Sequence, residues 1–326
     1  MLKTRITELL NIQYPIMQGG LQHLGTPELA SAVSNAGGLG TINALVYPTI
    51  PEFRAAIRQV KAMTNKPFCA NVSMLPTLSP GELTPEYFKV IVEEGVPVVE
   101  TAGRNPKDFI PMLKAAGIKL IHKVPSVKLA KKVENIGVDI VTIVGLECAG
   151  HPGMDDVTTI VLGNKTAKEL NLPVLIGGGI ADGAGLMAAL ALGGEGVVMG
   201  TRFVATEECI IHADFKKWIV GASENDTILI QRSIKNMVRA MKNKAASTCL
   251  EMEKNGAGLQ ELLAIISGKV GKKSMLEGDL DSGIFAAGQA VGLINDIKPA
   301  KQVIDDMIME AELIMKRLNG IYAKQQ

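Results

Sequence analysis

The chain has 326 residues, of which 47% are hydrophobic and 21% charged, a composition typical of a globular enzyme with a large core. Its formal net charge of +1 excludes the strong field of a protein that binds nucleic acid or an anionic membrane. No apolar run is long enough to span a bilayer, and the cysteines are too far apart for a disulfide framework or a metal site. We expect a reduced, cytoplasmic protein with a small-molecule substrate.

Short apolar runs that are rich in β-branched residues and bounded by glycine predict eight strands. They lie at 14–20, 39–44, 68–74, 96–102, 119–124, 138–144, 173–179 and 196–202. One helical pattern separates each pair, at 27–36, 51–63, 85–94, 106–116, 127–136, 157–170 and 182–192, and a proline-rich loop covers 75–85. Eight evenly spaced units predict an α/β fold, a (β/α)8 TIM barrel, in preference to a doubly wound sheet.

The regular alternation ends after the eighth predicted strand. Residues 207–273 contain helical patterns and no convincing strand, which predicts a helical lid inserted into a barrel formed by 1–206 and 274–326. The alternative is a long eighth helix. A last helical section is expected to open at 281–283, and an amphipathic helix at 303–318 closes the chain. Its apolar face suits either the barrel wall or a homodimer.

The stretch at 147–153, Glu-Cys-Ala-Gly-His-Pro-Gly, directly follows the sixth predicted strand. Catalytic residues of parallel α/β folds lie at the carboxyl ends of strands. A single histidine in a loop is more often structural, but this position makes His151 the leading catalytic candidate. Cys148 is interpreted as a small buried residue, and Glu100 is left without a role.

Glycine-rich turns follow the seventh and eighth predicted strands. Gly178, Gly179, Gly200 and Thr201 lie where a TIM barrel commonly binds phosphate through backbone amides. The chain has neither a GxGxxG motif after its first strand nor a P-loop. A phosphate-bearing cofactor at the barrel mouth is therefore expected, although a tight strand-to-helix turn would need the same glycines.

FMN fits this expectation best. Asn71 can hydrogen-bond the edge of a flat ring, and Lys123 can place positive charge near the flavin N1–C2 region. A surface charge at a strand end is the alternative for Lys123. A barrel that binds a phosphate ligand without redox activity also remains open, but Lys123 and His151 together favour catalysis.

Several motifs together resemble the nitronate monooxygenase family, once called 2-nitropropane dioxygenases. They are Pro-Ile-Met-Gln-Gly-Gly at 15–20, Ala-Gly-Gly-Leu-Gly at 36–40, Asn71, His-Lys at 122–123, Glu-Cys-Ala-Gly-His at 147–151, Gly-Gly-Gly-Ile-Ala at 177–181 and Met-Gly-Thr-Arg-Phe at 199–203. The runs at 147–153, 200–209 and 281–283 look most like the bacterial FMN-dependent NADH:quinone reductases. The family also resembles flavin-type enoyl-acyl carrier protein reductases, in which glycine replaces Ala149.

The resemblance implies non-covalent FMN, a helical lid, and His151 over the flavin at the substrate site, with His23 as a second candidate. The implied FMN contacts are Gly19, Gly20, Asn71, Lys123, Ala149, Gly150, Gly178, Gly179, Gly200 and Thr201, with 288–289 nearby.

The predicted function is a ping-pong reaction in which NADH or NADPH reduces FMN and a quinone then collects two electrons. Nitronate oxidation with oxygen and enoyl-thioester reduction are the alternatives.

Overall fold

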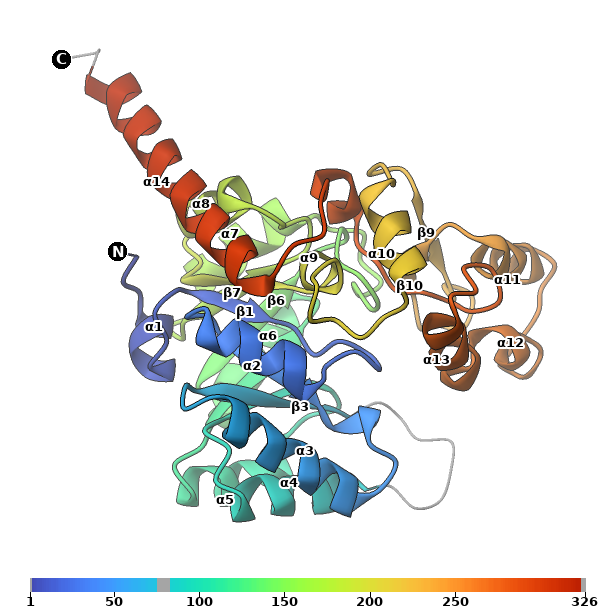
Figure 1. Cartoon of the computed structure of the whole chain (residues 1–326), viewed down its shortest axis with the longest axis horizontal. Helices are drawn as coiled ribbons and strands as arrows, with labels where there is room; N and C mark the ends of the chain where they lie inside the picture. Colours follow the sequence, from blue (N-terminus) through green and yellow to red (C-terminus); the bar gives the residue numbers. More distant parts are fainter. Residues whose placement is uncertain (1, 75–82, 324–326) are drawn as a thin grey trace.

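The computed structural model describes residues 2–74 and 83–323. Eight parallel strands form one sheet in the order β1-β8-β7-β6-β5-β4-β3-β2. The strands are β1 (Ile16–Gln18), β2 (Gly40–Asn43), β3 (Phe68–Met74), β4 (Val98–Gly103), β5 (Lys119–Val124), β6 (Ile140–Val144), β7 (Val174–Gly177) and β8 (Gly196–Met199). A parallel bridge between Met17 and Leu39 joins the edge strands, so the sheet closes into a barrel (Figure 1). The predicted (β/α)8 barrel is confirmed.

Helices surround the barrel and connect successive strands (Figure 1). They are α2 (Pro27–Asn35), α3 (Ile50–Met63), α4 (Thr84–Glu93), α5 (Ile110–Ala115), α6 (Val127–Ile136), α7 (Thr159–Glu169) and α8 (Gly183–Ala191), with short 3-10 turns η1 (Ala44–Val46) and η2 (Lys107–Phe109). The long closing helix α14 (Ala300–Ala323) contacts both α8 and α2, so it completes the ring. Residues 75–82 of the predicted proline-rich loop lie outside the described residues.

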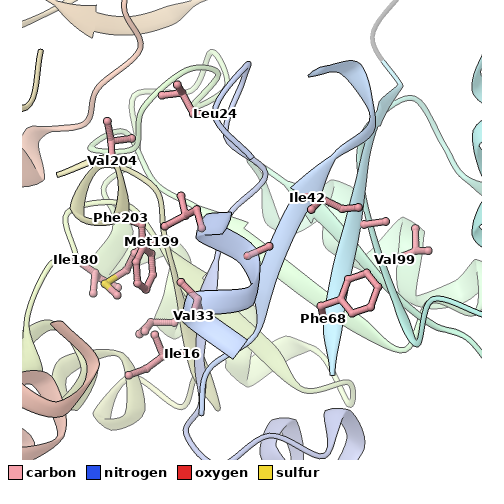
Figure 2. Packing of buried hydrophobic residues seen from close by; sticks show 14 of the residues in the cluster. Ile16, Leu24, Val33, Ile42, Phe68, Val99, Ile180, Met199, Phe203 and Val204 are labelled. Atoms are coloured by element: carbon pink, nitrogen blue, oxygen red, sulfur yellow. The ribbon is translucent and has the colours of Figure 1, made fainter. Parts of the chain in front are cut away.

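The barrel interior has two layers of different chemistry. The lower one is apolar and consists of Leu39, which immediately precedes β2, and one residue from each of the other strands: Met17, Cys69, Val98, Ile121, Ile140, Leu175 and Val198. A helix that the sequence did not predict, α1 (Arg5–Leu10), seals the amino ends of the strands by packing Ile6 and Leu10 against this layer. A larger apolar cluster lies between strands and helices, and Figure 2 shows labelled members such as Ile42, Phe68 and Val99.

The positions two residues further along the chain, in each strand or directly after it, face the same interior, because strand residues alternate between the two faces. We call this second set the polar layer; it consists of Gly19, Thr41, Asn71, Glu100, Lys123, Thr142, Gly177 and Gly200. It lies toward the carboxyl ends of the strands, where this fold carries its chemistry.

A buried glutamine holds the barrel closed where β1 and β2 meet. Gln18 is fully buried, and its Nε2 donates to the Thr41 carbonyl (2.8 Å) while its Oε1 accepts from the Thr41 amide (3.2 Å). The Thr41 hydroxyl donates to the Gln18 carbonyl oxygen (2.5 Å). Side-chain bonds therefore extend the short ladder between these two strands.

We expect Gln18→Leu to lower the free energy of unfolding by about 1–3 kcal/mol, because two buried backbone groups of Thr41 lose their partner. Urea denaturation measures the change. Gln59→Leu is the control, because Gln59 is an exposed glutamine on α3 and its loss should cost no more than about 0.5 kcal/mol. Equal effects of the two substitutions would contradict this role of Gln18.

The segment between β8 and α14 forms an insertion at the carboxyl side of the barrel (Figure 1). After the short helix α9 (Thr201–Val204), it contains α10 (Ala213–Val220), α11 (Lys244–Lys254), α12 (Leu259–Ile266) and α13 (Gly268–Glu277). The expectation of no strand here is wrong, since β9 (Thr227–Ile230) and β10 (Val238–Met241) form an antiparallel hairpin. Ile230, Val238 and Leu262 share a separate apolar cluster, whose sheet face is covered by helices. We propose that 207–273 is a lid unit.

The chain returns to the barrel in irregular structure. A helical section was predicted from 281, but between residue 281 and α14 the structure has only the 3-10 turn η3 (Gln289–Leu293). Asp279 Oδ1 accepts from the amides of Asp281 (3.0 Å) and Ser282 (3.1 Å), which favours a turn over a helix. Within the described ranges, no helix combines the length and apolar character needed to span a membrane.

Candidate functional site

Asn71 belongs to the polar layer and is fully buried. Its Nδ2 donates to Glu100 Oε2 (2.5 Å), and its Oδ1 accepts from Ser73 Oγ (3.1 Å). Gly20 passes so close that a Cβ there would lie 2.2 Å from Asn71 Cγ. Two neighbours therefore fix the Asn71 amide, and only glycine at position 20 allows the β1 loop to lie against it.

Two buried atoms of the polar layer have no hydrogen-bond partner among the described residues. They are Glu100 Oε1 and Thr142 Oγ1. Lys123 lies on β5, between the strands that carry them, and is paired in register with Thr142. The Lys123 ammonium makes no hydrogen bond or ion pair with any residue in the described ranges. Buried polar groups are normally satisfied, so this layer fits a polar ligand above it.

The stretch at 147–153 is held rigidly at its first residue. Glu147 Oε2 accepts from the Thr159 amide (2.9 Å) and hydroxyl (2.8 Å), at the first turn of α7. A carboxylate at this position satisfies a helix amide that has no partner within the helix. The backbone carbonyl of Glu147 accepts from the Gln289 amide (3.0 Å), so the segment that returns from the lid to the barrel lies beside the stretch at 147–153. Glu147 is therefore a structural residue.

The lid hairpin holds the middle of the same stretch. Gly150 has φ +69, and its backbone exchanges two hydrogen bonds with Arg239 of β10, at 3.0 Å and 2.7 Å. Arg239 is buried; its Nε donates to the Leu146 carbonyl (2.9 Å) and a terminal nitrogen donates to Thr227 Oγ1 (2.9 Å). Desolvation lowers the pKa of its guanidinium. The sequence analysis missed Arg239, although a lone arginine in the apolar run at 237–241 was the available signal.

His151 lies beyond this anchor and its side chain is exposed. Desolvation by the surrounding protein lowers the pKa of the imidazole, and the charge of Lys123 lowers this pKa further. A hydrogen bond with the Asn236 side chain acts in the opposite direction. His151 is therefore neutral at neutral pH and can accept a proton.

The charge of Lys123 also affects the pKa values of His122 and Cys148. Burial lowers the pKa of His122 to about 4, with a smaller contribution from Lys123, and Thr101 Oγ1 lies 2.7 Å from His122 Nδ1. Burial raises the pKa of the Cys148 thiol to about 12 despite the opposing charge of Lys123. Both side chains are therefore uncharged at neutral pH. Cys148 was expected to be buried, but it is half-buried in the structure.

The glycines expected to bind phosphate come together at the ends of the neighbouring strands β7 and β8. Gly178 and Gly179 have φ of +104 and +72. Thr201 Oγ1 accepts from the Gly288 amide (3.0 Å), so the returning chain lies beside this turn as well. A Cβ on Gly288 would approach the Glu147 carbonyl oxygen to 2.7 Å and the Ala149 amide to 3.1 Å. The two glycine turns and 147–149 thus surround one place at the barrel mouth.

We expect Gly178→Ala to lower both stability, by about 1–3 kcal/mol, and the flavin content of the purified protein. The added Cβ would meet Thr159 Oγ1 at 2.7 Å in a backbone conformation that disfavours side chains. Gly117→Ala is the matched control, since Gly117 has φ +71 but open space around its Cβ. A Gly178→Ala protein with full flavin content would argue against a phosphate site at this turn.

His23, the second histidine candidate, faces the lid. It has φ +61, and its Nε2 would lie 3.6 Å from a Cβ on Gly268, the first residue of α13. Burial lowers its pKa, followed by the charge of Lys272. The structure therefore places His23 between the β1 loop and the lid. In the described part of the chain, no three His, Cys, Asp or Glu side chains form a group that could hold a metal.

Comparison with known proteins identifies the family. The nitronate monooxygenase family model matches residues 3–310. The chain belongs to this family. A (3aS,4S,5R,7aS)-5-hydroxy-7a-methyl-1-oxo-octahydro-1H-indene-4-carboxyl-CoA dehydrogenase from Rhodococcus jostii is 30% identical, with 99% of this chain and 98% of that protein covered. A nitronate monooxygenase from Paraburkholderia phytofirmans is 29% identical, with 97% of each covered.

Solved structures agree with this assignment. FabK from Thermotoga maritima has a TM-score of 0.91 and 41% identity, with 98% of this chain and 100% of that chain covered. The protein is therefore an oxidoreductase of the nitronate monooxygenase family, and the sequence-based prediction of a flavin-dependent enzyme is confirmed at this level.

Proposed function

We propose that this protein is an FMN-dependent oxidoreductase that moves a hydride between NADH or NADPH and the acyl chain of a thioester. The thioester is suggested by the Rhodococcus jostii relative, which is named for a carboxyl-CoA substrate and aligns over nearly its whole length. The observation that carries the chemistry is that the charge of Lys123 acts on the neutral imidazole of His151. Lys123 belongs to the polar layer and has no hydrogen-bond or ion-pair partner among the described residues.

The donor set suits FMN. Asn71, Lys123 and the unsatisfied Glu100 Oε1 are polar groups for a flat heterocyclic ring, and the glycine turns at 178–179 and 200–201 are amide-rich ends for its phosphate. Gly19, Gly20, Ala149 and Gly150 are small enough for close approach of a ring. FMN, when bound, supplies two-electron chemistry that no side chain of this protein can perform.

His151 would carry the proton that accompanies the hydride. A proton on the carbon next to a thioester carbonyl is acidic enough for a neutral imidazole to remove it during dehydrogenation. In the reverse direction, the protonated imidazole returns a proton to that carbon while the neighbouring carbon receives the hydride. The positive charge of Lys123 favours negative charge developing nearby in either direction.

An anaerobic assay that follows NADH and NADPH at 340 nm tests the proposal. We expect consumption with crotonyl-CoA as the acceptor and formation of one butyryl-CoA for each nucleotide oxidised. If either nucleotide reduces the flavin, and menadione reoxidises it but crotonyl-CoA does not, the electron acceptor is a quinone and not a thioester. Flavin reduced by propionate 3-nitronate and by neither nucleotide would favour nitronate oxidation.

The quinone is the second candidate, and the resemblance of 147–153 and 200–209 to NADH:quinone reductases favours it. The same residues serve this reaction, because a quinone also takes a hydride equivalent and a proton. His151 would then return the proton to a quinone oxygen. The two acceptors differ in size and polarity, so the assay above separates them.

A further inference from the structure

The loop that leads to His151 is fixed to the barrel at its beginning. The Leu146 amide donates to the Val157 carbonyl (2.9 Å), and the Glu147 carboxylate accepts from the first turn of α7. Further along, the backbone of 149–151 makes hydrogen bonds with the described residues only through Gly150. The bonds of Gly150 therefore decide where the next residue, His151, lies.

Arg239 of β10 supplies both backbone partners of Gly150. The two residues exchange hydrogen bonds of 3.0 Å and 2.7 Å, as paired residues of antiparallel strands do. Because both backbone groups of Arg239 point toward Gly150, the pairing of β10 with β9 lies on its other edge. The loop therefore extends the lid hairpin by one more strand position.

The side chain of Arg239 reaches the same loop at its other end. It is buried; its Nε donates to the Leu146 carbonyl (2.9 Å), and a terminal nitrogen donates to Thr227 Oγ1 on β9 (2.9 Å). A planar guanidinium can hold two acceptors at once in a fixed geometry, which a lysine ammonium does not reproduce. One lid residue thus binds Leu146 and Gly150, four positions apart, and fixes the shape of the loop between them.

We propose that Arg239 is a positioning residue for His151, and that the lid hairpin moves as one piece with the loop that leads to this histidine. The inference rests on the proposed role of His151 as proton carrier. Because β10 and Gly150 are joined through their backbones, a displacement of the hairpin also displaces His151. Lids commonly complete a catalytic arrangement when they close, and this lid would do so by placing the proton carrier.

Hydrogen exchange and histidine NMR test this on the purified protein. Arg239→Met removes both side-chain donors and keeps a long side chain. We expect exchange of the Gly150 amide to become about 10-fold faster or more, the effect of losing a hydrogen bond from a charged group. The His151 pKa should rise toward the ordinary value, because its present surroundings and Lys123 lower it. Arg239→Lys should behave like Arg239→Met, because it keeps the charge and loses the two-pronged contact.

Asn243→Ala is the matched control for a buried lid residue. Asn243 Nδ2 donates to the carbonyls of Leu280 (2.6 Å) and Gly283 (2.9 Å), so its loss also frees two carbonyls in the lid region. Exchange should become faster around 280–283, whereas exchange of the Gly150 amide and the His151 pKa should stay at the wild-type values.

Turnover by the holoenzyme gives the second measurement. Arg239→Met should lower kcat with crotonyl-CoA by up to about 10²-fold, the effect of a misplaced catalytic group, with little change in KM. Reduction of the flavin by NADH should stay at the wild-type level, because that step does not need the proton carrier.

Unchanged Gly150 exchange and an unchanged His151 pKa in Arg239→Met would overturn the inference, and so would wild-type behaviour of Arg239→Lys. If Arg239→Met does not fold, Thr227→Val removes only the acceptor that orients the guanidinium. It should produce the same changes at smaller size, and their absence would also overturn the inference. If the wild type does not reduce crotonyl-CoA, the proposed function fails, and the exchange and NMR results still decide whether Arg239 positions His151.

Discussion

Replacing Lys123 by methionine is expected to slow reduction of the enzyme by NADH by about 10²-fold or more, the effect of removing one preorganised charge from an active site. The unbranched side chain of methionine fills much of the volume of the lysine side chain, so this substitution tests the loss of the positive charge. The same substitution should raise the pKa of His151, because the charge of Lys123 lowers it. Stopped-flow absorbance and histidine NMR measure the two effects on one protein.

Lys119→Met is the matched control for this experiment. Lys119 begins the same strand, β5, and is half-buried like Lys123, but it lies at the amino end of the barrel. Its loss should leave both the reduction rate and the His151 pKa unchanged. If Lys123→Met behaved like Lys119→Met, Lys123 would be a charge at a strand end with no part in the chemistry.

His151→Gln is expected to keep the flavin and its reduction by NADH, and to lower turnover of the acyl thioester by about 10²–10⁴-fold. In the wild type, dehydrogenation should fall as the pH falls through the His151 pKa, because only the neutral imidazole accepts a proton. That pKa lies below the usual histidine value. In a plot of the dehydrogenation rate against pH, the loss of activity at acidic pH should therefore occur below pH 6.5. This loss should be absent in His151→Gln.

His212→Asn is the control for the loss of a histidine. His212 caps α10 by accepting from the Asp214 amide (3.3 Å), and asparagine can keep that bond. Turnover should stay at the wild-type level. Loss of flavin in His151→Gln would instead assign His151 a structural role at the cofactor.

Periodicity made the barrel predictable from sequence. Each barrel strand combines an apolar run with a following glycine or polar residue, and alternation places Asn71 and Lys123 on the face that points inward. The same rule failed at Thr227–Ile230, because a four-residue run inside a region of helical patterns gives too little signal. The glycines near 283 and 288 were likewise read as part of a helix, although Asp279 turns the chain there.

Contacts between distant parts of the chain were beyond sequence reasoning. Glu100 could be assigned a partner, Asn71, only once adjacent strands fixed their register. Arg239 reaches the stretch at 147–153 through the lid hairpin, and no local pattern links those segments. Side chains that strand alternation places, such as Asn71 and Lys123, were therefore predictable, whereas contacts that depend on strand register or on the lid were not.

The most direct test of the account is an anaerobic titration of the purified enzyme with NADH, followed by crotonyl-CoA, monitored through flavin absorbance. We predict that stoichiometric NADH bleaches the flavin band and that crotonyl-CoA restores it with formation of butyryl-CoA. A flavin that NADH and NADPH leave oxidised, or a reduced flavin that no acyl thioester reoxidises, would contradict the account.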